Sequence, residues 1–208
     1  MRLILASTSP RRREILTLLG VPFEAIEPVF EERLSADRST RGEVEAFALG
    51  KARSVGLDDE DAIIIGSDTM IALDGEKFGK PQDRSDAARM LRAFSGKTHR
   101  IFTGVAIIDG TGGAGLVTVE EIDVDMRPLS DADIDRYLAC DESMDKAGAY
   151  SIQGRGAELI RAIRGDFLAA VGMPLKPVAD YLAYVGVSFP LDVEQLYRDK
   201  AFQNWRRF

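Results

Sequence analysis

The chain has 208 residues, of which 45% are hydrophobic and 29% are charged, and its formal net charge is -7 at pH 7. This composition is typical of a globular protein with a sizeable core, and we expect a single domain over residues 1–208. The acidic balance disfavours a protein that binds nucleic-acid polymers. One cysteine and one histidine exclude a Cys/His zinc site. Because no apolar run has the length of a membrane span or the form of a signal peptide, we expect a cytoplasmic protein without membrane contact.

The chain opens with a pattern that predicts strand, turn and helix. Residues 2–6 (RLILA) form a short apolar run typical of a buried strand, and residues 7–10 (STSP) predict a turn with a capping hydroxyl. Pro10 suits the first position of a helix, and Gly20 suits its end. The free N–H groups of a helix N-terminus would therefore lie directly after the strand.

A second compact run, residues 62–66 (AIIIG), predicts a central strand that delivers Ser67, Asp68 and Thr69 at its end. Asp74 and Gly75 then predict a hairpin turn, which a purely parallel sheet does not contain. We therefore predict an α/β fold with a mixed sheet. The remaining expected elements are strands 23–26, 100–108 and 116–126 and helices 43–55, 83–94, 132–139, 175–185 and 193–205.

The first candidate site is the serine-rich turn with the helix that follows. The positive end of the helix dipole favours an anion near Ser7, and Arg11 and Arg12 supply bidentate phosphate donors. A well-capped helix with a solvated basic first turn is the alternative, although it would place cations where the dipole opposes them. On the residues alone the two interpretations are evenly matched.

Further candidates gather around the second strand. Asp68 is suited to hold Mg²⁺ or to take a proton from water, Glu32 is suited to share that metal, and Lys51 and Lys80 are suited to neutralise phosphate charge. Gln153, in a segment of small residues, offers a donor and an acceptor to a base edge. Taken singly, each is more typical of a turn residue or a solvated surface charge. The set, and not any one member, indicates a site.

Other catalytic classes find little support in the sequence. His99 begins an apolar strand and is predicted to make a structural hydrogen bond, and Cys140 has no partner arrangement of a nucleophile. The sequence lacks a GxSxG elbow and a GxxxxGK[ST] loop. The sequence therefore gives no support to a serine-histidine-aspartate triad.

Taken together, the motifs resemble the Maf family of nucleotide pyrophosphatases in their order and spacing, over roughly residues 2–185. Met70, the glycine-rich stretch 110–115 and the C-terminal stretch 193–208 depart from the family pattern. The segments that carry the likeness are LASTSPRR (5–12), EE (31–32), GSDTM (66–70), GKP (79–81), FSGKTH (94–99), TGV (103–105), KAGAYSIQG (146–154), GDF (165–167) and VGMPL (171–175).

The resemblance implies a housekeeping enzyme that hydrolyses nucleoside triphosphates to the monophosphate and pyrophosphate with a divalent cation, Mg²⁺ or Mn²⁺. It implies a twisted, elongated mixed sheet flanked by helices in two lobes, with the substrate in a central cleft, as in inosine triphosphate pyrophosphatases. It also implies a homodimer, for which the residues give no independent interface. The implied catalytic residues are Asp68, Glu32, Lys51 and Lys80, with Glu32 and Asp68 as metal ligands and Ser7, Arg11 and Arg12 near the phosphates.

Within the family, Thr69 and Gln153 resemble the branch that acts on dTTP and UTP, and Arg11 joins them as a specificity position. Modified pyrimidine nucleotides also fit such a pocket. Two alternatives remain: a non-catalytic nucleotide-binding regulator of septum formation, and a purine-type pyrophosphatase acting on 7-methyl-GTP or on ITP and XTP. Turnover that depends on Asp68 would exclude the non-catalytic regulator. Competition between purine and pyrimidine triphosphates would show whether the enzyme is of the purine type.

Overall fold

The computed structural model describes residues 1–35, 37–55 and 61–208. Within these ranges one seven-stranded sheet has the order β2-β1-β3-β5-β6-β7, with β4 paired to β3. β1 pairs in parallel with β2 and β3, and every other pairing is antiparallel. The predicted α/β fold with a mixed sheet is confirmed.

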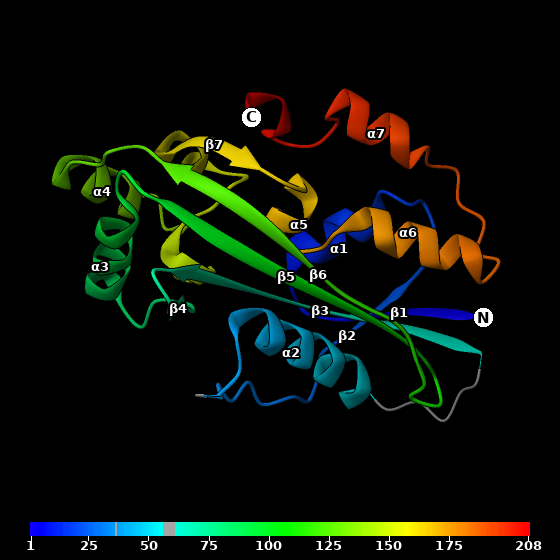
Figure 1. Cartoon of the computed structure of the whole chain (residues 1–208). Coiled ribbons are helices and arrows are strands. Elements are labelled where there is room, and N and C mark those ends of the chain that lie inside the picture. Colours follow the sequence, from blue (N-terminus) through cyan, green and yellow to red (C-terminus); the bar gives the residue numbers. More distant parts are fainter. Residues whose placement is uncertain (36, 56–60) are drawn as a thin grey trace.

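Figure 1 shows the long strands β3, β5 and β6 running through the middle of the molecule, with α2 on one face of the sheet and α1, α5 and α6 on the other. The strands are β1 Arg2–Ala6, β2 Glu24–Ile26, β3 Ala62–Leu73, β4 Glu76–Phe78, β5 Thr98–Asp109, β6 Ala114–Met126 and β7 Ile160–Arg164. The α-helices are α1 Pro10–Thr17, α2 Thr40–Ser54, α3 Arg84–Phe94, α4 Asp131–Leu138, α5 Phe167–Val171, α6 Leu175–Tyr184 and α7 Val193–Asp199. Three short 3-10 helices are η1 Ala147–Ala149, η2 Arg155–Leu159 and η3 Trp205–Arg207.

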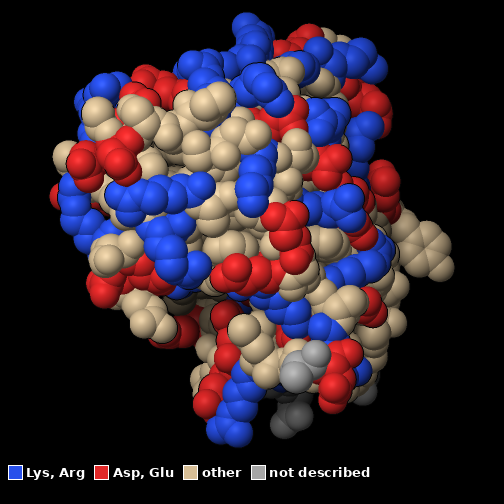
Figure 2. Space-filling view, turned by 60° about the vertical axis from the view of Figure 1, so that its left-hand side comes forward, with Lys and Arg blue, Asp and Glu red and all other residues tan. Residues whose placement is uncertain are grey.

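The surface carries charges of both signs. On the face that Figure 2 presents, basic and acidic side chains are interspersed and no single sign covers it. In the part of the chain that the structure describes, no helix has the length and apolar character to cross a membrane.

α2 packs directly onto the sheet at two glycines. A Cβ on Gly66 of β3 would lie 2.7 Å from a backbone nitrogen of α2, and a Cβ on Gly104 of β5 would lie 2.7 Å from a backbone oxygen of the same helix. Side chains at these positions would push the helix away from the sheet. The close approach brings Lys51, on α2, next to Asp68, which pairs with Gly104 in the β3–β5 ladder.

The larger part of the core lies on the opposite face. There α1, α3, α5 and α6 bury apolar side chains against the sheet, and burial of such side chains stabilises the fold by about 25 cal/mol per Å² of apolar surface. Fully buried members of this cluster include Leu5, Ile15, Phe94, Ile122, Leu168 and Val178. The site residues on α1 and β3 are thus attached to a packed scaffold.

β3 is longer than the sequence predicts. We expected it to end at Gly66 and to place residues 67–69 beyond its end, but the strand continues to Leu73. The prediction was wrong because antiparallel pairing with β5 continues over residues 63–72 of β3, and polar side chains leave main-chain hydrogen bonds intact. The parallel neighbour β1 ends opposite Gly66, so residues 67–69 still lie just past the carboxyl end of β1.

Other boundaries also differ from prediction. α2 begins at Thr40, three residues early, because the Ser39 side chain accepts a hydrogen bond from an N–H of the first turn. α7 ends at Asp199 because Lys200 adopts a left-handed conformation with φ of 49°. The short elements β7 and α5, of five residues each, were not predicted.

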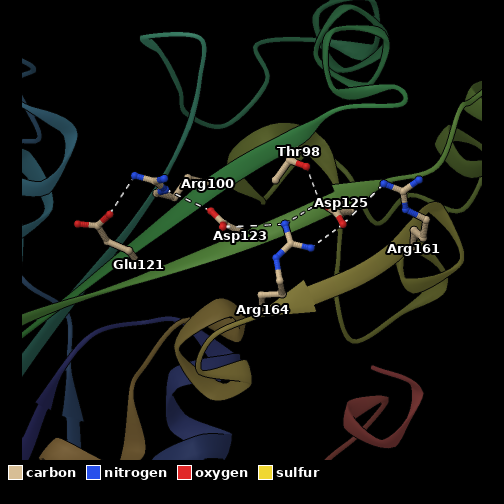
Figure 3. A network of polar contacts seen from close by, with 7 residues as sticks. All are labelled: Thr98, Arg100, Glu121, Asp123, Asp125, Arg161 and Arg164. Carbon is tan, nitrogen blue, oxygen red and sulfur yellow. Dashed lines mark hydrogen bonds and ion pairs between the residues drawn. The ribbon is translucent and has the colours of Figure 1, made fainter.

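A network of charged side chains lies on β5, β6 and β7 (Figure 3). At its centre Asp125 accepts hydrogen bonds of 2.7 and 3.1 Å from Arg164 and another from the Thr98 hydroxyl. The Asp125 side chain is only 9% exposed. The bonds from Arg164, with that from Thr98, lower the pKa of Asp125 to about 2.

We expect Asp125→Asn to lower the free energy of unfolding by about 2 kcal/mol at neutral pH, because each pKa unit corresponds to about 1.4 kcal/mol. The folded-state pKa lies below the unfolded one, so this contribution is complete above about pH 4 and is lost as the pH falls towards about 2. Urea unfolding at neutral and at acid pH measures the difference. Asp131→Asn, at a 77% exposed position, is the control. Equal stability of Asp125→Asn and wild type at neutral pH would contradict the account.

Candidate active site

All nine predicted site residues line one cleft of about 660 Å³. Its walls include the N-terminal end of α1, the middle of β3 and parts of the segments 27–34 and 145–153. The nine residues are Ser7, Arg11, Arg12, Glu32, Lys51, Asp68, Thr69, Lys80 and Gln153. Residues far apart in the sequence therefore meet at a single place.

A lysine bridges two carboxylates in this cleft. Lys51 Nζ lies 2.5 Å from Asp68 Oδ1 and 2.5 Å from Glu32 Oε1. The side chains of Lys51 and Asp68 are buried, whereas that of Glu32 is 53% exposed. Partial burial raises the pKa of Glu32, but the hydrogen bond and charge of Lys51, with the charges of Lys80 and Arg12, outweigh it and lower that pKa below its ordinary value. Glu32 is thus ionised at neutral pH.

The segment that carries Glu32 is held in place by a buried carboxylate that the sequence did not reveal. Glu43, in the first turn of α2, has no exposed surface and accepts hydrogen bonds from the Ser35 N–H at 3.2 and 3.1 Å. Lys77, on β4, donates to Glu43 Oε2 at 2.9 Å and to the Arg38 carbonyl at 2.8 Å. These contacts fix the end of the segment that follows Glu32.

The N-terminus of α1 leaves backbone donors open to the cleft. Contrary to the predicted capping hydroxyl, the Ser9 side chain makes no cap hydrogen bond. Instead Ser7 Oγ accepts from the Ser9 N–H at 3.1 Å and from Arg12 Nη1 at 3.4 Å. Free N–H groups at a helix N-terminus attract anions, so this turn can receive an anionic group.

Arg12 is held from three sides. Its Nε donates to the Gly172 carbonyl at 3.0 Å, and its terminal nitrogens reach the hydroxyls of Ser7 and Thr69 at 3.4 Å each. Burial lowers the pKa of Arg12, while Asp68 and Glu32 oppose that effect, and a guanidinium stays charged in proteins. The cation is therefore fixed between α1 and β3.

Arg11 and Lys80 are less constrained. Arg11 Nη1 donates to Asp145 Oδ2 at 3.3 Å, which joins α1 to the segment on the other side of the cleft. Asp145 also pairs with Lys146, a basic residue at the cleft that was not among the predicted site residues. Lys80 is exposed and makes no ion pair with the residues that the structure describes. It is available for an incoming anion.

Thr69 and Gln153 also line the cleft. Thr69 Oγ1 lies 3.1 Å from the Thr103 hydroxyl. Gln153 is 9% exposed, and its Nε2 donates to Glu14 Oε2 at 3.0 Å. Glu14 was not predicted as a site residue, because its contact with Gln153 spans 139 positions of sequence. Thr69 Oγ1 and Gln153 Nε2 thus each have a partner within the protein.

His99 has the structural role that the sequence predicts. It is buried, and its Nε2 lies 2.6 Å from the Tyr150 hydroxyl. Burial lowers the pKa of His99 to about 4, so the ring is neutral at pH 7. Cys140 lies outside the cleft, where its thiol donates to the Arg136 carbonyl at 3.4 Å.

The pair Glu32 and Asp68 fits a divalent cation that also binds substrate phosphates. Among the described residues, no group of three or more His, Cys, Asp or Glu side chains gathers as a metal cage. Mg²⁺ in nucleotide sites is typically held by one or two carboxylates together with phosphate oxygens. The two carboxylates converge on Lys51 Nζ at the edge of a cleft lined by cationic groups, so this donor set meets that requirement.

Comparison with known proteins gives consistent matches. A profile of the family described as Maf-like protein matches residues 2–185. A dTTP/UTP pyrophosphatase of Moorella thermoacetica is 44% identical over 186 residues, covering 89% of this chain and 96% of its own length. One of Bacillus velezensis is 46% identical over 174 residues, covering 84% and 91%. A solved nucleoside-triphosphatase / dITP/XTP pyrophosphatase from Mycobacterium abscessus has a TM-score of 0.43 and 17% identity, covering 89% and 94%, a likeness too loose to carry a conclusion.

The fold and the cleft define an α/β protein arranged to receive an anionic ligand. The family profile over residues 2–185 and the relatives at 44% and 46% identity identify the family within this class. The chain belongs to the Maf family.

Proposed function

We propose that this protein is a nucleoside triphosphate pyrophosphatase that hydrolyses dTTP and UTP to the nucleoside monophosphate and pyrophosphate. The observation that carries the proposal is the meeting of an anion-binding helix N-terminus and a carboxylate–lysine centre in one cleft. The dTTP/UTP pyrophosphatases of Moorella thermoacetica and Bacillus velezensis support the choice of substrate.

In the proposed reaction, water attacks the α-phosphorus in line with the α–β anhydride bond. That bond breaks, pyrophosphate leaves, and the proton lost by the water passes to Asp68. Lys51 lies between Asp68 and Glu32, so its positive charge holds the two carboxylates close together. A bound Mg²⁺ or Mn²⁺, held by Glu32 and Asp68, would supply Lewis-acid stabilisation of the phosphate charge.

The cationic residues of the cleft stabilise the triphosphate. Arg12 and the N–H groups at the start of α1 receive phosphate oxygens, with Ser7 alongside. Arg11 and Lys80 add charge on the leaving side, where negative charge develops as the anhydride breaks. These cationic residues gather at the cleft although the net charge of the whole chain is negative.

Thr69 and Gln153 are proposed to read the base. Their hydroxyl and amide groups line the same cleft as the phosphate-binding residues. Hydrogen-bonding groups of this kind reject analogues that leave them unpaired more strongly than an apolar wall does. Pyrimidines that carry modifications on the ring remain candidate substrates.

Pyrophosphate release from dTTP, UTP, CTP, GTP, ITP and 7-methyl-GTP, with Mg²⁺ or Mn²⁺ and with excess chelator, tests the proposal. We expect dTTP and UTP to give the highest kcat/KM and chelation to abolish release. Preference for ITP or 7-methyl-GTP would overturn the choice of base. Binding of nucleotides with no release from any of them would favour a non-catalytic regulator.

A further inference from the structure

The C-terminal segment 193–208 lies beyond the residues that the family profile matches. Figure 1 shows α7 and the C-terminus on the same side of the sheet as α5 and α6. Trp205 stacks on Phe167, with ring centroids 5.3 Å apart and an interplanar angle of 11°. The Tyr197 hydroxyl donates to Asp166 Oδ2 at 2.9 Å. The segment is therefore firmly attached to the body of the protein.

Asn204 connects this segment to the strip of chain that carries Gln153. Its side-chain nitrogen Nδ2 approaches three successive carbonyl oxygens, of Ile152 at 3.2 Å, Gln153 at 2.5 Å and Gly154 at 3.3 Å. Asn204 has φ of 64°, in the left-handed region that asparagine tolerates better than most residues. A single amide thus restrains residues 152–154.

The side chain of Gln153 is oriented by a second contact. A carboxylate accepts hydrogen bonds, so the Gln153 amide turns its Nε2 towards Glu14 Oε2. Among the residues that the structure describes, Gln153 Oε1 accepts no hydrogen bond, and the residue lines the cleft. The amide therefore offers an acceptor to a ligand.

We propose that Asn204 is a positioning residue for base recognition. It holds residues 152–154 so that Gln153, turned by Glu14, presents Oε1 to the ring N–H that lies between the two carbonyl groups of uracil and thymine. Cytosine has a lone pair at that ring position, so the same acceptor disfavours it. The inference rests on the proposed function for the identity of the base, but the restraint by Asn204 is testable without substrate.

Asn204→Gly is the main variant, because glycine adopts the same left-handed backbone and lacks the amide. Lys200→Gly is the matched control: Lys200 has φ of 49° in the same segment, and its backbone N–H, not its side chain, makes the hydrogen bond to Tyr197. Asn204→Asp, which keeps the size of the side chain but replaces the donor with an acceptor, is the second variant. For each protein, hydrogen exchange of residues 151–156 without nucleotide, the melting temperature, and kcat and KM for UTP and CTP are measured.

We expect exchange of residues 151–156 to accelerate in both Asn204 variants and KM for UTP to rise about tenfold in Asn204→Gly, which corresponds to one net hydrogen bond. We expect kcat to stay within about twofold and the preference for UTP over CTP to fall. Lys200→Gly should match wild type throughout.

Unchanged exchange in both Asn204 variants would overturn the restraint. Faster exchange with unchanged KM and unchanged preference would overturn its role in recognition. Absence of wild-type turnover of any pyrimidine triphosphate would instead refute the proposed function, with the exchange result still deciding the restraint.

Discussion

Asp68→Asn is expected to lower kcat for dTTP by about 10³-fold, because it removes both the proposed proton acceptor and a proposed metal-binding charge while preserving shape. The side chain lies in the middle of β3, buried and bonded to Lys51, so the amide occupies the same place without the charge. Steady-state pyrophosphate release by wild type and variant measures the effect. Thermal unfolding of the same samples separates lost chemistry from lost fold.

The control for this variant is Asp74→Asn, the same change in the hairpin that follows β3. Asp74 is exposed, pairs with Lys97 at the surface and has φ of 51°, which asparagine accepts. It should keep wild-type turnover. Retention of more than about a tenth of wild-type kcat by Asp68→Asn would refute the role assigned to Asp68.

Lys51→Met is expected to lower kcat/KM by about 10²-fold and the free energy of unfolding by about 3 kcal/mol. The lysine is the cation between Asp68 and Glu32, so its loss leaves two carboxylates facing each other with no cation between them. The same loss removes a positive charge next to the proposed metal ligands. Affinity of the nucleotide-free protein for Mn²⁺ should therefore rise while turnover falls.

Titration with Mn²⁺, urea unfolding and pyrophosphate release together test this combination. Lys97→Met removes an exposed lysine that pairs with Asp74, and it should change none of the three. If Lys51→Met bound Mn²⁺ no more tightly than wild type and turned over normally, the carboxylate–lysine centre would not be the reaction centre.

The sequence predicted those elements that short stretches of neighbouring residues determine. The run 2–6 with Pro10 and Gly20 predicted β1 and α1, and the Asp74-Gly75 pair predicted the hairpin between β3 and β4. It failed where pairing between distant segments decides the outcome. β3 continues past Gly66 because β5 pairs with it, and no feature of the local sequence contains that pairing.

The same distinction holds at the site. Motif order identified the nine residues that line the cleft, and the structure brings them together. The contacts that hold the walls of the cleft were not predictable, because they join residues far apart in sequence: Arg11 with Asp145, Gln153 with Glu14, and Lys77 with Glu43. Lys77 and Glu43 belong to none of the motifs, and lysine and glutamate side chains are usually exposed to solvent. The divalent cation, the homodimer, the single domain and the cytoplasmic location stay predictions.

Phosphorus-31 NMR of the products of dTTP hydrolysis tests the central claim most directly, because it identifies the bond that breaks. With Mg²⁺ present, the account predicts dTMP and pyrophosphate in equal amounts from the first turnovers, and neither in the Asp68→Asn sample on the same timescale. Formation of dTDP and inorganic phosphate would place the cleavage at the β–γ bond and contradict the account.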